Sequence, residues 1–278
     1  MDKLFWKTIQ ENNYAIPAGH TPTSLTAELF SYLGSTDPEL RDQIAYEMFA
    51  NFLERDYYSL AEIKIYIANL LANLDIGIGE PESDSVFLRS FSALCLAAII
   101  HNDNKAPQLK RPLVQTILEK GLRHLASEQD LRGYVKRKGW AHALAHTADL
   151  LLVLGRSLNT GRSDHSLILI GISEKLVQPT PWVYLYGEDE RLARATLEVL
   201  RRGTLAATFV GRWLDSFLKP NGKSWKGGWT EVRSAHAFFN VRNFIRSLYF
   251  QVVSEDGFPL QEELEQLLLE TIQNLRPY

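Results

Sequence analysis

The stretch Gly139-Trp-Ala-His-Ala-Leu-Ala-His-Thr-Ala-Asp-Leu-Leu-Leu152 carries the strongest structural pattern in this chain. Alanine and leucine dominate it, and no proline or glycine interrupts it before Gly155, so the pattern predicts a helix that ends at Gly155. At about 100° per residue, His142, His146 and Asp149 share one side of that helix. Because the helix is otherwise almost entirely apolar, it is predicted to lie in the interior of the protein.

Helical spacing of apolar residues continues on both sides of this stretch, whereas strand-like alternation is nearly absent. Ser59 and Glu188 are predicted to open helices, and residues 84–100 to form a nearly apolar one, followed by a turn at 101–107. Only Trp182–Tyr186 resembles a strand, and an extended loop or a helical turn suits that short run equally well. About a dozen helices of roughly 10–18 residues, joined by short turns, are therefore predicted.

Short connections make successive helices antiparallel neighbours, so the pattern predicts an all-α protein. We expect a single domain over residues 1–278 with the architecture of an α-α superhelix, a HEAT-like solenoid of degenerate repeats. A globular bundle or an α/α toroid is the alternative. In a solenoid the second helix of each pair lines a concave surface, and buried helices with polar stripes would lie there.

Composition limits the classes of partner and compartment. The 278 residues include 30 basic and 33 acidic side chains, and this net charge of -3 argues against a nucleic-acid partner. Cys95 is the single cysteine and lies in an apolar run, which favours an inert thiol in a reducing cytoplasm. We find no signal-peptide pattern and no apolar run of about 18 residues, so no membrane association is expected.

His142, His146 and Asp149 are the first candidate site. Imidazoles four residues apart can bind one divalent metal, and a carboxylate one turn later can bind it too or orient a ligand. The HxxxHxxD spacing lacks the glutamate that marks zinc-peptidase helices. The alternative is a pair of core histidines that hydrogen-bond to carbonyl groups or to Asp149.

A second polar stripe contains Arg233, His236 and Asn240, which could present donors to an anion from a concave face. Trp225 and Trp229, in the glycine-rich loop before it, could form the rim of that binding groove. An ordinary amphipathic helix with a solvated face and a packed structural loop are the alternatives.

Three further groups of charged residues could belong to a binding site or could serve only the fold. Glu188 and Asp189 could supply carboxylates to the groove, although negative charge also stabilises the start of any helix. Residues 136–138, Lys-Arg-Lys, could bind a phosphate or form a solvated turn. Arg89 lies in an apolar helix, so it is predicted to form a buried ion pair.

Four segments together resemble a bacterial family of uncharacterised function that is found largely in lactobacilli, bacilli and their relatives. They are Arg132-Gly-Tyr134, Gly139-Trp-Ala-His-Ala-Leu-Ala-His-Thr-Ala-Asp-Leu-Leu151, Phe87-Leu-Arg-Ser-Phe-Ser-Ala-Leu94 and Asp189-Glu-Arg-Leu-Ala193. The resemblance covers most of the chain and implies an all-α, HEAT-like protein. It implies no particular activity.

The preferred hypothesis is a binding or scaffold protein with a polar concave groove around His142, His146 and Asp149. Its partner would be a protein segment or a small polar ligand. The alternative is a metal-dependent hydrolase that uses the same three residues, with Glu188, Asp189 or His236 completing the shell. A nucleic-acid-processing enzyme is the least favoured hypothesis because of the net negative charge.

Overall fold

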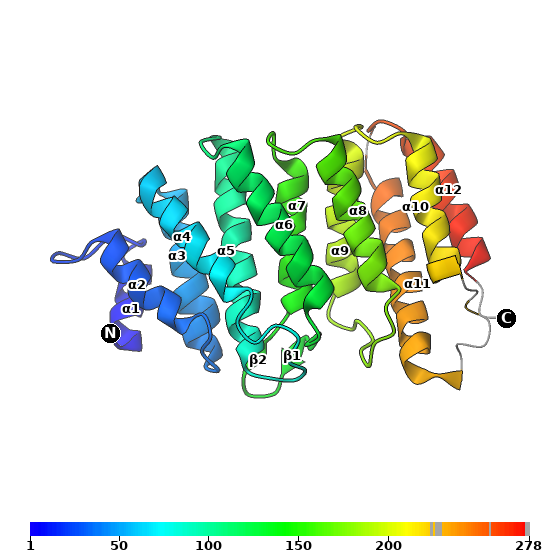
Figure 1. Ribbon diagram of the computed structural model, residues 1–278. Coiled ribbons are helices and arrows are strands. Elements are labelled where there is room, and N and C mark those ends of the chain that lie inside the picture. The colour runs from blue at the N-terminus through cyan, green and yellow to red at the C-terminus, as the bar shows by residue number, and fades with distance from the viewer. Residues whose placement is uncertain (223–224, 226–229, 256, 276–278) are drawn as a thin grey trace. The chain divides into compact units, whose positions relative to one another are not determined.

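The protein is described by a computed structural model that covers residues 1–222, 225, 230–255 and 257–275 (Figure 1). This described part holds twelve α-helices, one π-helix, one 3-10 turn and one sheet of two short strands, which confirms the all-α class. The elements in chain order are α1 (Lys3–Glu11), α2 (Pro22–Tyr32), η1 (Glu39–Tyr46), α3 (Glu47–Glu54), α4 (Leu60–Asn73), α5 (Ser85–Lys105), α6 (Arg111–Ser127), β1 (Tyr134–Val135), β2 (Gly139–Trp140), α7 (Ala143–Arg156), α8 (Arg162–Leu176), α9 (Glu188–Arg201), α10 (Ala207–Leu218), η2 (Pro220–Gly222), α11 (Val232–Val253) and α12 (Gln261–Asn274).

The chain forms two compact units, Met1–Leu150 and Leu151–Tyr278, and the boundary falls within α7. In unit 1, α5 packs against η1, α3 and α4. In unit 2, each helix packs on the next but one in the chain: α8 packs on α10, and α9 packs on α11. This local pattern is the one that a helical solenoid requires, and the solenoid over the whole chain stays a prediction.

Side-chain caps explain where several helices begin. Helix α4 begins after Ser59 and α9 begins at Glu188, and both starts agree with the prediction. Ser59 and Glu62 form a reciprocal capping box at the start of α4. Thr21 caps α2, and Pro22 occupies the first helical position, where its missing N–H costs nothing. Helix α10 begins at Ala207 without a side-chain cap, and the nearby Thr204 hydroxyl is hydrogen-bonded to the His165 ring on α8.

Helix α5 is the core of unit 1, with 13 of its 21 residues buried. It extends to Lys105, so the predicted turn at 101–107 was placed too early. Within the described part of the chain α5 alone has the length and composition to cross a membrane, and 67% of its apolar window is buried, as in a core helix. Cys95 on α5 is fully buried, as its apolar surroundings predicted, and this burial raises the pKa of its thiol.

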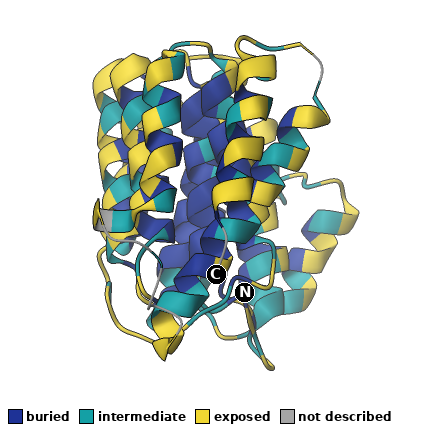
Figure 2. Cartoon of the chain, turned by 90° about the vertical axis from the view of Figure 1, so that its right-hand side faces the viewer, coloured by how far each residue is buried: buried dark blue, intermediate teal, exposed yellow. Residues whose placement is uncertain are grey.

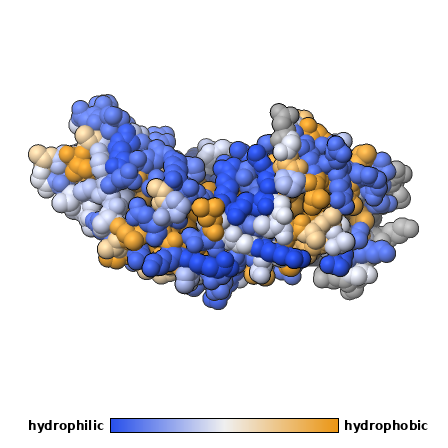
Figure 3. All heavy atoms as spheres, turned by 90° about the horizontal axis from the view of Figure 1, so that it is seen from above, coloured by the Kyte–Doolittle hydropathy of each residue, from blue (hydrophilic) through white to orange (hydrophobic). Residues whose placement is uncertain are grey.

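Aromatic side chains fill the core of unit 2. The rings of Trp213, Phe217 and Phe244 lie within 5.1–6.3 Å of one another, and the Trp213 indole donates to the Leu169 carbonyl at 2.8 Å. Figure 2 shows buried residues in dark blue on the inward sides of the helices and exposed residues in yellow on the outward sides. Some apolar side chains also reach the surface, where Figure 3 shows them in orange among hydrophilic residues.

Candidate functional site

A short β-hairpin stands where the sequence predicted the start of the central helix. Strands β1 and β2 pair antiparallel, with Tyr134 opposite Trp140, and residues 136–138 form the turn. The pairing continues past the strands, because Ala141 and His142 donate backbone hydrogen bonds to the carbonyls of residues 133 and 132. Helix α7 therefore begins at Ala143, and the prediction of a helix from Gly139 was wrong by four residues.

Left-handed backbone at two positions excludes the helix that the sequence pattern favoured. Gly139 has a φ of 77° and His142 a φ of 49°, and neither value is compatible with an α-helix. A side chain at residue 139 would also place its Cβ 2.7 Å from the Cβ of Pro38, so only glycine fits there. His142 consequently precedes α7, and its carbonyl accepts the first helical hydrogen bond, from His146 at 2.9 Å.

A fully buried arginine from η1 holds the hairpin tip. The Arg41 guanidinium donates to the Lys138 carbonyl at 2.9 Å and to the Ser35 carbonyl at 2.7 Å. It also lies 4.2 Å over the Phe87 ring and 4.8 Å over the Phe91 ring, both on α5. These contacts fix the hairpin against the N-terminal half of α5.

A second buried arginine holds the base of the same connection. Arg89 makes a two-pronged ion pair with Glu128 at 2.7 and 3.0 Å, which confirms the predicted buried pair. The Glu128 carboxylate also accepts the backbone N–H of Asp130. Asp130 in turn pairs with Arg132 at 2.6 Å. The backbone that leads into the hairpin is therefore tied to α5 by buried charges.

The two histidines lie beneath the hairpin and are buried. His142 is 6% exposed, and its ring stacks on Trp140 with ring centroids 4.3 Å apart. The His146 ring is 5% exposed and makes edge contacts with His142 at 5.8 Å and with Phe91 at 4.9 Å. Together with Tyr134, whose ring meets Trp140 at 5.0 Å, these rings form a continuous stack that reaches from the surface into unit 1.

The hydrogen bonds of Ser90 indicate that His146 carries a proton on Nδ1. Ser90 on α5 lies 2.8 Å from His146 Nδ1, and its hydroxyl also donates to the carbonyl of Ala141. Because a serine hydroxyl carries only one proton, His146 Nδ1 must donate to Ser90. The serine proton is directed to a carbonyl and the side chain is fully buried, so this pair anchors α5 to α7 and lacks the arrangement of a nucleophile with its base.

The predicted metal ligands do not assemble into a three-residue cluster. Among the described residues no group of three His, Cys, Asp or Glu side chains is placed to hold a metal ion. His142 and Asp149 do not belong to one helical face, because His142 precedes α7 and only His146 and Asp149 lie within it. The geometry therefore does not support the metal prediction.

The remaining candidates all belong to unit 2, and several have structural contacts. Asn240 is fully buried and uses its amide to bind the backbone of Tyr184 and Trp182, both at 2.9 Å. The Glu188 side chain is 2% exposed, accepts the Tyr186 N–H at 2.9 Å, and has its pKa raised by burial. These contacts hold residues 182–186, which form neither a strand nor a helix.

Asp189 and Trp225 also have partners inside unit 2. The Asp189 carboxylate accepts from Ser247 on α11 at 3.4 Å. The Trp225 indole donates to the Phe217 carbonyl at 2.7 Å. Its ring also meets Phe238 edge-on at 5.5 Å. Trp225 is therefore half-buried and packs against α10 and α11.

Two groove candidates at the start of α11 stay accessible, and one cannot be placed. Arg233 is exposed and its carbonyl accepts from Thr180, whereas the half-buried His236 has no hydrogen-bond partner for its Nδ1 atom within the described residues. Trp229 lies outside the described residues. The groove that joins these residues to the histidines stays a prediction.

Residues 74–250 match the family described as "Protein of unknown function (DUF2785)". The chain belongs to this family. No curated protein and no solved structure matches the chain. The matched segment of this DUF2785 protein includes α5, the hairpin and nearly all of α11, so both units contribute to it. The predicted resemblance to a family without assigned activity is thereby confirmed.

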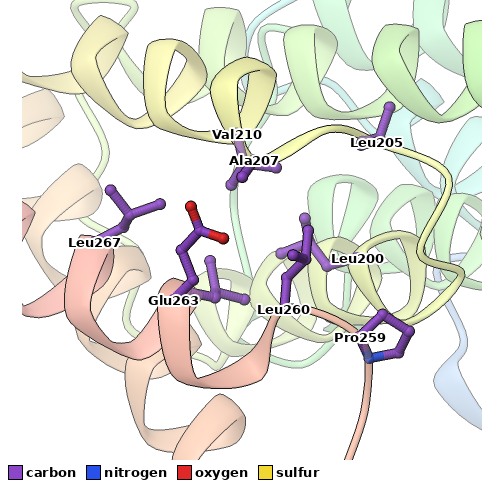
Figure 4. A pocket seen from close by; sticks show the side chains of 9 residues that line it. Leu200, Leu205, Ala207, Val210, Pro259, Leu260, Glu263 and Leu267 are labelled. Atoms are coloured by element: carbon purple, nitrogen blue, oxygen red, sulfur yellow. The ribbon is translucent and has the colours of Figure 1, made fainter.

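This DUF2785 protein also has a small apolar cleft in unit 2 (Figure 4). Figure 4 shows the Glu263 carboxylate pointing into the space between α12 and the start of α10. The side chains that line the cleft come from α9, α10 and α12 and the turns beside them, and they are Leu200, Leu205, Ala207, Val210, Pro259, Leu260, Glu263, Leu264 and Leu267. Glu263 itself is exposed, so it is an ordinary surface carboxylate beside an apolar cleft.

The exposed part of the hairpin is the feature of this DUF2785 protein that sequence reasoning missed. Tyr134 is 50% exposed and Trp140 39% exposed, and the side chains of Lys136 and Arg137 are exposed between them. A signal was present, because Tyr-Val and Gly-Trp flank a short polar turn, a pattern typical of a hairpin. The strong helical pattern that follows from Ala143 hid it.

Proposed function

We propose that this DUF2785 protein is a binding protein whose ligand is an acidic segment of another protein, held by the exposed side of the hairpin. Tyr134 and Trp140 would contact apolar or aromatic groups, and Lys136 and Arg137 would pair with carboxylates. Aromatic and arginine side chains are the residues most enriched at protein interfaces. The carrying observation is the exposure of the residues Tyr134 and Trp140, at 50% and 39%, on a rigidly held hairpin.

Rigidity supports the proposal because a fixed surface loses little conformational entropy on binding. Arg41 fixes the hairpin tip, and the Trp140 ring already rests on His142. In this proposal the binding surface is the hairpin, and the two histidines do not contact the ligand directly. His142 stacks on the inner side of Trp140, and His146 packs against His142. A ligand would touch Trp140 and Tyr134 first, since the imidazoles are only 5–6% exposed.

Charge supports the choice of an acidic ligand. The described residues offer no carboxylate within ion-pair distance of Lys136 or Arg137, whereas Lys138 pairs with Asp84 at 2.6 Å. Two cations beside two exposed rings therefore complement a chain segment that carries both carboxylates and apolar groups. A cytoplasmic location belongs to the same proposal, and the single buried thiol supports it.

The metal-dependent hydrolase has less support from the geometry. Among the described residues no three His, Cys, Asp or Glu side chains are placed to hold one metal ion. The binding function explains the exposed hairpin, which the hydrolase would leave without a role.

A peptide-display library panned on the purified protein tests the proposal. We expect recovered sequences rich in Asp and Glu with interspersed apolar residues, and binding that weakens as salt is raised. The double variant Lys136→Glu/Arg137→Glu should bind these peptides at least about ten-fold more weakly, since the change replaces attraction with repulsion. Both side chains are exposed, so the variant should keep the wild-type melting temperature.

A matched control uses the same charge change elsewhere, in Lys64→Glu on the exposed side of α4, which should leave peptide binding unchanged. Recovered peptides without acidic enrichment, or equal binding to wild type and to the hairpin double variant, would refute the acidic-segment proposal.

A further inference from the structure

Helix α11 has one well-packed face and one exposed face. Its inner face packs against α9 and α12 in unit 2. The buried apolar residues on that face are Ala237, Phe238, Val241, Phe244, Ile245, Leu248 and Val252. These contacts account for the folding of α11 and leave the opposite side of a 22-residue helix in solvent.

The exposed side of α11 carries four large apolar side chains in a line. Val232 is 65% exposed, Phe239 36%, Phe250 69% and Val253 40%. Arg246, which is also exposed, lies between them. At about 100° per residue all five fall within roughly 60° of one another. We call this set of five residues the α11 stripe.

The spacing of the α11 stripe is that of a helix-pairing surface. Val232, Phe239, Arg246 and Val253 follow one another at intervals of seven residues, and Phe250 lies one turn before the last of them. A seven-residue repeat keeps side chains on the line along which two helices cross at a shallow angle. Isolated exposed apolar residues are common, but an aligned series along a helix marks an interaction site.

The α11 stripe is complementary to itself when one copy is reversed. A two-fold axis between Arg242 and Asn243 places Val232 opposite Val253 of a second copy. It places Phe239 opposite Arg246, a cation over a ring, and both pairs occur twice because the interface is isologous. The Phe239 ring already has the Arg242 guanidinium 4.8 Å from its centre, so it accepts a cation in this setting.

Size and charge also match in this reversed arrangement. Phe250 lies opposite Ala235, a large side chain against a small one, and Arg242 lies opposite Asn243. Each directly opposed pair in this register therefore sets a charged residue against a neutral one or joins two neutral residues. A parallel arrangement would instead place Arg246 against its own copy, and the repulsion between the two cations would oppose it.

We propose that two copies of this chain associate through their α11 stripes as an antiparallel, two-fold symmetric dimer. A single pair of 22-residue helices, each about 33 Å long, forms an interface at the small end of stable complexes. The dimer is therefore expected to dissociate on dilution into the micromolar range. This inference concerns unit 2 and is independent of the hairpin proposal.

Sedimentation across a concentration series tests the association. Wild type should rise from the 31.7 kDa monomer toward twice that mass, and Phe250→Glu should shift the midpoint to at least about ten-fold higher concentration. Leu158→Glu is the matched control, because Leu158 is 77% exposed in unit 2 outside the stripe, and it should dimerise like wild type. A wild type that stays monomeric to millimolar concentration overturns the proposal.

Disulfide trapping tests the register. Cys95 is buried and is the only native cysteine, so introduced cysteines report without background. A mixture of Val232→Cys and Val253→Cys chains should form a cross-linked dimer at least about five-fold faster than either variant alone. Equal trapping in the single-variant samples would mean another register, and dimers that persist in Phe250→Glu would mean another surface. Either result overturns the proposed arrangement.

Discussion

The connection into α7 in unit 1 and the connection into α9 in unit 2 are held in place by opposite chemistry. Two buried guanidiniums hold residues 128–142 in place. Arg89, on α5, forms an ion pair with Glu128. Arg41 donates to the Lys138 carbonyl and lies over the Phe87 ring of α5. Residues 177–187 are tied down by the neutral amide of Asn240 and by the burial of Glu188. Both connections end at a helix start, and only the charged one displays an exposed aromatic hairpin.

The two connections differ in the free energy of unfolding that would be lost if one partner were removed. A buried ion pair gains little over an apolar replacement, yet removing one partner leaves an uncompensated charge in the interior. A buried amide that loses its partners costs less, because a neutral group is cheaper to leave without hydrogen bonds. The exposed hairpin of unit 1 is therefore held by the contacts whose loss would cost more stability.

Removing the carboxylate of Glu128 should have the largest effect. Glu128→Ala leaves Arg89, which is fully buried, without its ion-pair partner, so we expect a loss of about 3–5 kcal/mol in the free energy of unfolding. Urea denaturation followed by circular dichroism measures this loss. The matched double variant Arg89→Met/Glu128→Met removes both charges and should lose less than Glu128→Ala. A double variant less stable than the single one would contradict the uncompensated-charge explanation.

Truncating Asn240 should cost less. Asn240→Ala leaves the Tyr184 N–H and the Trp182 carbonyl without their partner, and we expect a loss of about 2 kcal/mol. Hydrogen exchange at the Tyr184 amide should accelerate at the same time. Asn243→Ala on the same helix is the control, because no hydrogen bond of its side chain exists within the described residues and it should stay within about 0.5 kcal/mol of wild type. Equal losses of stability in the two variants would show that the Asn240 hydrogen bonds do not stabilise residues 182–184.

The pH dependence of Asp42 should give the smallest effect. Burial raises the pKa of Asp42 to about 6, from 3.8 in the unfolded chain, although Arg41 beside it acts in the opposite direction. The native state therefore binds more protons than the unfolded state between these values, and this contribution to stability falls as pH rises from 4 to 7. Relative to Asp42→Asn, wild type should lose about 1–2 kcal/mol over that range, a value reduced because 27% of the side chain is exposed.

Denaturation of both proteins at several pH values measures this difference. A wild type that gains stability over Asp42→Asn as pH rises would mean that the charged form of Asp42 is the one that the fold favours. In that case Arg41 outweighs the burial of the carboxyl group.

Local rules predicted the helices well where one side chain or one turn decides the boundary. Ser59 caps α4 and Glu188 begins α9 as expected, since capping depends on neighbours within four residues. Burial of α7 and α5 also followed from composition, because an apolar helix has to lie in a core. The predicted ion pair of Arg89 follows from the cost of an isolated buried charge, although its partner, 39 residues away, could not be named.

The hairpin could not be predicted in the same way. Its tip is fixed by Arg41, which is 97 residues from Lys138 in sequence, and its backbone needs left-handed φ at Gly139 and His142. The helical pattern that begins at Ala143 has no local signal against extension to Gly139. Tertiary contacts therefore moved His142 out of the helix and separated it from the face that His146 and Asp149 share.

The sequence by itself determined an all-α protein, the position of most helices, the buried core helices and the buried thiol, because these follow from composition, periodicity and caps. The tertiary structure decided which polar residues are accessible. His142, His146, Asn240 and Glu188 are all buried, whereas Trp140 and Phe250 are exposed. The physical reason is that periodicity reports the side of a helix on which a residue lies, and only packing determines what covers that side.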